Sequence, residues 1–117
     1  MVPSMEIQES KSDDISLLTL RGRLDGQTST SAQERIVAII DQGATRVILN
    51  LGAVEYISSA GLRVFMTAAR RLKATNGRLV FCELQEGTRE LFEIAGLTEL
   101  FSICSTQDEA LKRIREN

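Results

Sequence analysis

Histidine and tryptophan are absent from this 117-residue chain, and its aromatic residues are only one Tyr and four Phe. Without histidine, a serine or cysteine nucleophile lacks its most common general base. The carboxylates are scattered along the chain and show no metal-ligand spacing, and no Gly-Lys-Ser/Thr phosphate loop follows Gly52. We therefore expect no catalytic residue, no metal site and no cofactor, and a core that is aliphatic.

Neither sign of charge dominates the chain. It has 14 Lys and Arg against 16 Asp and Glu, for a formal net charge of −2. Nucleic-acid binding needs a basic face of one sign, so we expect none. No apolar run approaches the ~20 residues that cross a bilayer, and Glu6 interrupts any signal-peptide pattern at the start. These features predict a cytoplasmic protein without direct membrane contact.

Cysteine is scarce as well: the chain contains only Cys82 and Cys104. Both lie in apolar segments that resemble strands. The simpler interpretation is a pair of buried thiols in a reducing compartment. The alternative is a disulfide or a redox pair.

Strand-like and helix-like patterns alternate along the chain. Met5–Glu9 and Ile15–Arg21 flank the polar turn Ser10–Asp14 and predict a hairpin. Because strands separated by helices run parallel to their neighbours, the sequence predicts an α/β fold with a mixed sheet of four to five strands and about four helices. We expect one domain over residues 1–117. The later strands are predicted at Arg46–Leu51, Arg78–Glu83 and Leu100–Cys104.

The predicted helices have recognisable ends and apolar faces. After a loop at Gly22–Thr30, Ser31 with Glu34 fits a capping box, as does Thr106 with Glu109. Gly43 and Gly96 are placed to end helices. The helices are predicted from Ser31 to Asp41, Ala60 to Asn76, Glu86 to Ala95 and Thr106 to about Glu116. Their expected inward residues are Ala32, Ile36, Ile39 and Ile40, then Leu62, Phe65, Ala69 and Leu72, then Leu91, Ile94 and Ala95.

Two adjacent hydroxyls, those of Ser58 and Ser59, stand where the second helix begins. The simpler role is a helix cap, which accepts N–H bonds worth ~1 kcal/mol. The alternative is a modified switch at Ser59, which can coexist with capping by Ser58. Arg63 follows Ser59 by one helical turn, within reach of a phosphate there, although a solvated arginine fits the position equally well. Asp25 most simply bonds turn amides.

Segments along the whole chain, taken in order, resemble the anti-sigma factor antagonist family, whose domain is called STAS. The central signature is carried by the strand-to-helix region, and an earlier loop resembles the family's Gly-Glu-Leu/Ile-Asp loop. The segments that carry the resemblance are Gly22–Asp25, Val47–Leu51, Val54–Ser59, Ala60–Arg63, Gly77–Phe81, Ile94–Leu97 and Leu100–Phe101.

This resemblance implies a partner-switching mechanism. Members of the family bind an anti-sigma factor, usually a serine kinase of the histidine-kinase-like ATPase fold, and thereby free a sigma factor for transcription. The kinase phosphorylates a hydroxyl at the position of Ser59, and a PP2C-type phosphatase restores the active form. The resemblance also implies a partner-binding surface that includes Asp25, Gly26, Thr28, Tyr56, Ser58, Ser59, Gly61 and Arg63.

The chain departs from the family pattern at three positions. Ser58 stands where Asp is common, and Ala60 stands where a second hydroxyl is common. Neither change removes the phosphate acceptor. Arg23 replaces a frequent Glu, which changes the charge on the expected contact surface.

Two other functions fit parts of the pattern. STAS-like domains also serve as soluble subunits of membrane-transport assemblies for lipids or anions, although the retained Ser59 argues mildly against that role here. A receiver-like protein that accepts phosphate on Asp would need an Asp at the end of its third strand. Asn50 and Gly52 occupy that region, so we discount the receiver.

Overall fold

The computed structural model describes residues 5–116, which form a five-stranded sheet in the order β1-β2-β3-β4-β5 and four helices. β1 pairs with β2 antiparallel, and every later pair of neighbours is parallel. The predicted α/β class and mixed sheet are confirmed. The strands are β1 Met5–Ser12, β2 Ile15–Leu24, β3 Arg46–Ile57, β4 Arg78–Cys82 and β5 Ser102–Cys104, and the helices are α1 Ser29–Asp41, α2 Ser59–Ala74, α3 Glu86–Ile94 and α4 Gln107–Arg115.

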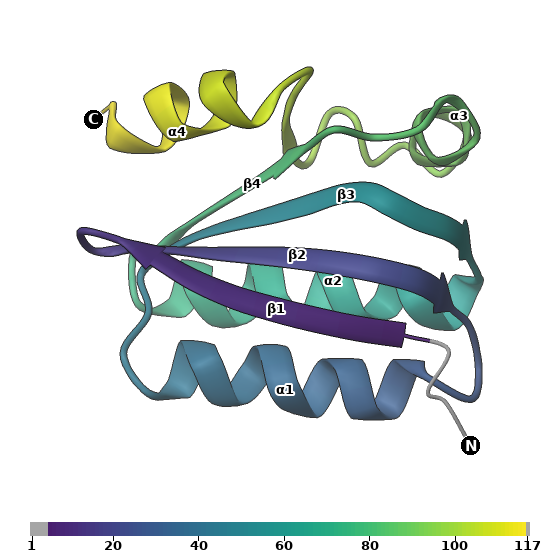
Figure 1. Ribbon diagram of the computed structural model, residues 1–117, viewed down its shortest axis with the longest axis horizontal. Helices are drawn as coiled ribbons and strands as arrows, with labels where there is room; N and C mark the ends of the chain where they lie inside the picture. The colour runs from purple at the N-terminus through teal and green to yellow at the C-terminus, as the bar shows by residue number, and fades with distance from the viewer. Residues whose placement is uncertain (1–4, 117) are drawn as a thin grey trace.

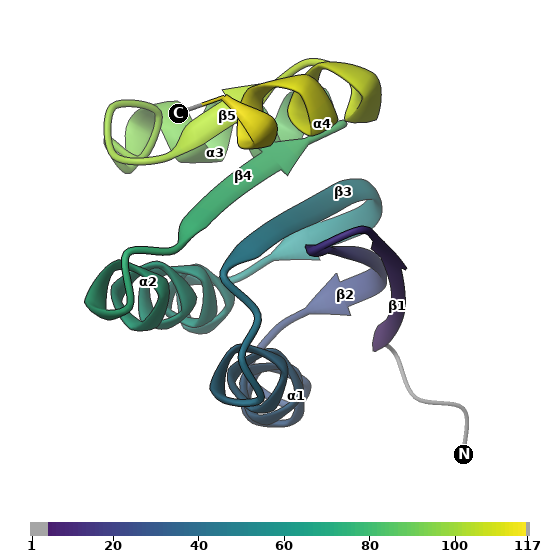
Figure 2. The same cartoon turned by 90° about the vertical axis from the view of Figure 1, so that its left-hand side faces the viewer.

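Helices cover both faces of the sheet. α1 and α2 lie side by side on one face, and α4 lies on the other (Figures 1 and 2). Successive residues of β3 serve the two faces, because strand side chains alternate. Val47, Leu49 and Leu51 pack toward α1 and α2, whereas Ile48 packs with residues of α4 such as Ile114. β3 is therefore a central strand that is covered on both faces.

The core is mostly aliphatic, as expected, but all four phenylalanines gather in one place. Phe81 on β4 lies at the centre, with its ring centroid 5.2 Å from Phe65, 5.5 Å from Phe92 and 4.8 Å from Phe101. Such offset and edge-on pairs add roughly 0.5–1.5 kcal/mol each beyond area burial. The cluster therefore ties α2 and α3 to the end of the sheet.

Three strands extend further than the sequence predicts. β1 ends at Ser12 instead of Glu9, which shortens the predicted turn Ser10–Asp14. β2 ends at Leu24 instead of Arg21, and β3 ends at Ile57 instead of Leu51. After Leu51 the inward residues of β3 are Val54 and Ile57, at a spacing of three. The register between β2 and β3 shifts twice in this stretch. These irregularities break the two-residue alternation that identifies a strand in a sequence. Because β2 extends to Leu24, the loop predicted at Gly22–Thr30 is shorter than expected.

One of the two predicted capping boxes is wrong. α1 begins at Ser29 with Thr28 at the N-cap position, so Ser31 and Glu34 lie inside the helix and are exposed. The second box is present: the Thr106 hydroxyl accepts the Glu109 N–H at 3.2 Å. The Glu109 carboxylate reaches back to the N–H of Ser105, one residue before the cap. Gly43 and Gly96 have φ of 113° and 74° at the predicted helix ends.

The predicted core-facing residues are confirmed for the first helix and only in part for the later helices. The four expected residues of α1 are buried, and so are Phe65 and Leu72 of α2. Leu62 and Ala69 are only half-buried, because Val64 and Ala68 face the core instead. The prediction for α3 is wrong at two of its three residues: Ile94 is 84% exposed, and Ala95 next to it is also exposed, whereas Leu91 is half-buried against the core. The buried residues of this helix are Thr88 and Phe92. Burial of Phe92 in the phenylalanine cluster sets the rotation of this short helix.

Candidate functional site

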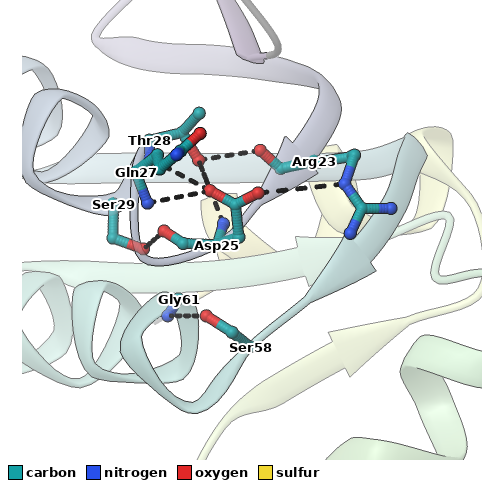
Figure 3. A network of polar contacts seen from close by, with 7 residues as sticks. All are labelled: Arg23, Asp25, Gln27, Thr28, Ser29, Ser58 and Gly61. Carbon is teal, nitrogen blue, oxygen red and sulfur yellow. Dashed lines mark hydrogen bonds and ion pairs between the residues drawn. The ribbon is translucent and has the colours of Figure 1, made fainter.

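The predicted site residues surround one end of the sheet, where the parallel strands β2 and β3 finish side by side. Leu24 and Ile57 are their last paired residues. The chain leads into α1 after Leu24 and into α2 after Ile57, so both helices begin at this end of the sheet (Figure 3). The Ser58 N–H donates to the Leu24 carbonyl at 2.9 Å. This bond fixes the start of α2 against the end of β2.

Ser58 is the cap of α2. Its backbone is extended, with φ −89° and ψ 175°, and its hydroxyl accepts the Gly61 N–H at 3.2 Å. The residue is half-buried. The capping role expected for one of the two serines is therefore confirmed for Ser58, and its hydroxyl is already engaged.

Ser59 differs from its neighbour in its surroundings. It is the first residue of α2 and is exposed, and among residues 5–116 no hydrogen bond engages its hydroxyl. The first turn of α2 carries no acidic residue. This turn therefore supplies no side-chain counter-charge to the partial positive charge of the helix start. Chemically, this is an accessible hydroxyl in a chain that has no histidine to act as its base, and it is suited to accept a group from an external enzyme.

Gly61 lies beneath this surface, not on it. A Cβ at this position would lie 2.9 Å from both the carbonyl oxygen and Cγ of Leu24, and 3.0 Å from Cγ2 of Ile57. Only glycine lets the first turn of α2 approach the strand ends this closely. The structure thus gives Gly61 a packing role that positions Ser59.

Asp25 organises the short turn between β2 and α1. Its Oδ1 accepts the N–H groups of Gln27 at 2.9 Å and Thr28 at 3.2 Å. The Thr28 hydroxyl accepts the Asp25 N–H at 3.0 Å and donates to the Arg23 carbonyl at 2.8 Å. The Ser29 hydroxyl donates to the Asp25 carbonyl (Figure 3). The expectation that Asp25 bonds turn amides is confirmed.

These bonds also stabilise the charged form of Asp25. The Gln27 N–H makes the largest contribution in lowering the pKa of the carboxyl, and Thr28 and the nearby Arg23 act in the same direction. Gly26, at the tip of the turn, is exposed, and a Cβ there would meet no atom within 4 Å. The turn is therefore rigid at its base and open at its tip.

Tyr56 and Arg23 form a stacked pair beside the serines. They are partners in the register between β2 and β3, and the guanidinium carbon lies 4.5 Å from the centre of the Tyr56 ring. The sequence analysis places Tyr56 on the expected partner-binding surface, and it notes for Arg23 only that this residue changes the charge of that surface. Their stacking could not be predicted, because it depends on the unpredicted extension of both strands.

Arg63 lies one turn along α2 and is exposed. Side chains of a helix lean toward its N-terminus, and Arg63 shares a shallow groove of about 280 Å³ with Ala60 and the start of α1. Across the described part of the chain it makes no ion pair. The other residues of the groove are Ser29, Thr30, Gln33, Glu34 and Val64.

The two cysteines lie away from this site. Cys82 on β4 and Cys104 on β5 are register partners, and both are buried free thiols under α4. Burial raises the pKa of the Cys82 thiol to about 12 and also raises the pKa of Cys104. The interpretation as buried thiols is confirmed.

Residues 5–116 contain no group of three or more His, Cys, Asp and Glu placed to hold a metal ion. Within the same residues, no helix has the length and apolar character needed to cross a membrane.

Comparison with known proteins gives a consistent result. The family model described as "STAS domain" matches residues 6–110. The chain is 36% identical over 106 residues, or 91% of both chains, to BtrV of Bordetella bronchiseptica, which is named as an anti-sigma factor antagonist. An anti-sigma factor antagonist structure from Mycobacterium paratuberculosis matches with a TM-score of 0.89 at 24% identity, over 97% of this chain and 96% of that one.

The Bacillus cell fate determinant SpoIIAA is similar in two states. Its phosphorylated form matches with a TM-score of 0.73 over 94% of this chain and 100% of its own, at 26% identity. Its unphosphorylated form matches at the same identity with a TM-score of 0.80, over 94% of this chain and 96% of its own.

Proposed function

The chain belongs to the STAS domain family, and we propose that it is an anti-sigma factor antagonist that binds a serine-kinase anti-sigma factor and is switched off by phosphorylation of Ser59. The observation that carries the proposal is the exposed Ser59 hydroxyl at the start of α2. It stands beside Ser58, the half-buried cap of α2, and beside a turn held in place by Asp25. The names of the relatives support this role over a subunit of a transport assembly.

The physical effect of phosphorylation follows from the position of Ser59. A phosphate adds roughly −1.5 to −2 charges at pH 7. At a helix start this charge is favoured by about 0.3–1 kcal/mol, so the fold tolerates it. The switch therefore acts outward: a partner that accepts a neutral hydroxyl meets repulsion and a poorer fit.

The return to the active form needs a second enzyme. The chain has no histidine to act as a base beside Ser59, and we propose that it has no catalytic activity of its own. A PP2C-type phosphatase would remove the phosphate from the same exposed position. Both partners would meet the protein in the cytoplasm.

Intact-mass analysis tests the acceptor. The purified protein is incubated with ATP and the kinase-type anti-sigma factor encoded nearest to its gene. We expect one phosphate on the wild type and on Ser58→Ala, and none on Ser59→Ala. A phosphate that persists on Ser59→Ala and is lost from Ser58→Ala would move the acceptor to the capping serine and overturn the assignment.

A further inference from the structure

The stacked pair of Arg23 and Tyr56 is unusual among the surface residues of this protein. The side chain of Arg23 is 50% exposed and Tyr56 is 44% exposed. Among residues 5–116 the other exposed large hydrophobics are Ile94 and Leu100, in α3 and in the segment before β5. Exposed Tyr and Arg dominate the binding energy of protein interfaces more often than other residue types.

Arg23 is held from two sides, and within residues 5–116 no hydrogen bond engages its two terminal nitrogens. Its Nε lies 3.8 Å from Oδ2 of Asp25, and its guanidinium stacks on Tyr56. Figure 3 shows its two terminal nitrogens pointing away from Asp25. Because the side chain is already fixed, little conformational entropy is lost when these nitrogens bind a partner.

The neighbouring carboxylate does not compete for those donors. Oδ1 of Asp25 is occupied by the N–H groups of Gln27 and Thr28, and its Oδ2 lies nearest to Nε of Arg23, not to the terminal nitrogens. The terminal nitrogens of Arg23 form a planar fork, which matches a carboxylate in two parallel hydrogen bonds. The fork therefore selects an acidic group from outside the chain.

We propose that Arg23 and Tyr56 form a recognition pair for an acidic patch on the anti-sigma factor. In this arrangement an Asp or Glu of the partner binds the fork of Arg23, and the Tyr56 ring fills an apolar pocket next to it. The inference rests on the proposed function, because that function supplies the occupant.

The acidic patch also explains why a phosphate on Ser59 would weaken binding rather than strengthen it. Tyr56 precedes Ser59 by three residues, and the Ser58 N–H is bonded to the residue after Arg23. A partner carboxylate bound at Arg23 therefore lies close to the acceptor serine. The negative charges that attract Arg23 repel a phosphate on Ser59.

Binding of the co-encoded kinase-type anti-sigma factor to charge variants tests the proposal. We expect Arg23→Glu to weaken binding about 100-fold and Arg23→Gln about tenfold, since like charges at an interface cost several kcal/mol. Arg21→Glu is the matched control, because Arg21 is an exposed arginine on the same strand; it should change affinity by less than about threefold. Thermal unfolding checks that each variant is folded.

A label on Tyr56 locates the contact directly. Tyr56 is the only tyrosine in the chain, so fluorotyrosine incorporation gives one ¹⁹F resonance. We expect this resonance to shift when the unlabelled kinase is added, and Tyr56→Phe to bind better than Tyr56→Ala.

The outcomes separate the two proposals. If the wild type does not bind the kinase, the proposed function fails. If the wild type binds and Arg23→Glu binds equally well or more tightly, or if the ¹⁹F resonance does not move, only the recognition pair is overturned.

Discussion

At the scale of single residues, Ser58 and Ser59 show how two identical side chains acquire different roles. The Ser58 hydroxyl accepts an N–H of the first turn, and this residue is half-buried, whereas Ser59 is exposed and no hydrogen bond within residues 5–116 engages its hydroxyl. One hydroxyl stabilises the helix, and the other is free for chemistry with a partner. Gly61 keeps both in place, because it allows α2 to rest on the ends of β2 and β3.

The two serines should therefore differ in their effect on stability. We expect Ser58→Ala to lower the free energy of unfolding by about 1 kcal/mol, the usual value of a lost N-cap. Ser59→Ala should change it by less than about 0.5 kcal/mol, as for an exposed position without contacts. Urea denaturation of both variants measures the difference. Equal losses would contradict the assignment of the cap to Ser58.

Gly61 and Gly26 make a second matched pair. A methyl group at Gly61 meets Leu24 and Ile57 at 3.0 Å or less, whereas one at Gly26 meets nothing within 4 Å. Overpacking of this kind costs about 1–3 kcal/mol. We expect Gly61→Ala to lose that amount in urea denaturation, and Gly26→Ala to stay within about 0.5 kcal/mol of wild type.

The lowered pKa of Asp25 gives its turn a defined pH dependence. Hydrogen bonds hold the folded-state pKa below the ordinary value of 3.8. The stabilisation from this carboxylate is then complete above the ordinary value and is lost as the pH falls through the lower, folded value. We expect the stability difference between wild type and Asp25→Asn to be constant near neutral pH and to shrink below pH 3.8. A difference that grows as the pH falls would contradict this account.

At the scale of elements, α3 is positioned by a single aromatic side chain. Phe92 is buried between Phe65 and Phe81, and Ile94 on the same helix faces solvent. The other residues of this nine-residue helix that face the core are Thr88, which is small, and Leu91, which is only half-buried. Its orientation therefore depends on this anchor more than on its overall apolar pattern.

Substitutions in α3 test the anchor. We expect Phe92→Ala to cost about 3–5 kcal/mol, as for other large-to-small changes in a core. Ile94→Ala should remain within about 0.5 kcal/mol of wild type, because its side chain is exposed. Chemical denaturation of the two variants measures both values. A larger loss of stability for Ile94→Ala than for Phe92→Ala would show that Ile94 faces the core, and would contradict this orientation of α3.

The α3 result also shows which parts of the structure follow from the sequence. The order of elements, the mixed sheet and the cap at Ser58 are local or topological features, and the sequence predicts them. The rotation of α3 depends on Phe92 meeting phenylalanines from distant segments. The ends of β2 and β3 depend on register shifts between two strands. No pattern within one segment reveals the rotation of α3 or the register of two strands. The sequence therefore does not predict the stacking of Arg23 on Tyr56.

At the scale of the whole molecule, the proposed acceptor Ser59 lies at the edge of a well-packed fold. The sheet is covered by helices on both faces (Figure 2). Phe65 and Leu72 anchor α2 in the core. SpoIIAA matches this fold in both its phosphorylated and its unphosphorylated forms. We therefore expect the phosphorylated protein to keep its backbone amide spectrum, apart from residues near Ser59.

The most direct test of the central claim is the affinity of the kinase-type anti-sigma factor for three forms of the chain. We predict that Ser59→Ala binds within about threefold of wild type and that Ser59→Asp binds at least about tenfold more weakly, since the added charge disrupts the interface. Enzymatic phosphorylation of Ser59 should weaken binding further, because a phosphate carries more charge than a carboxylate. Equal affinity for the unmodified and the phosphorylated chain would contradict the account.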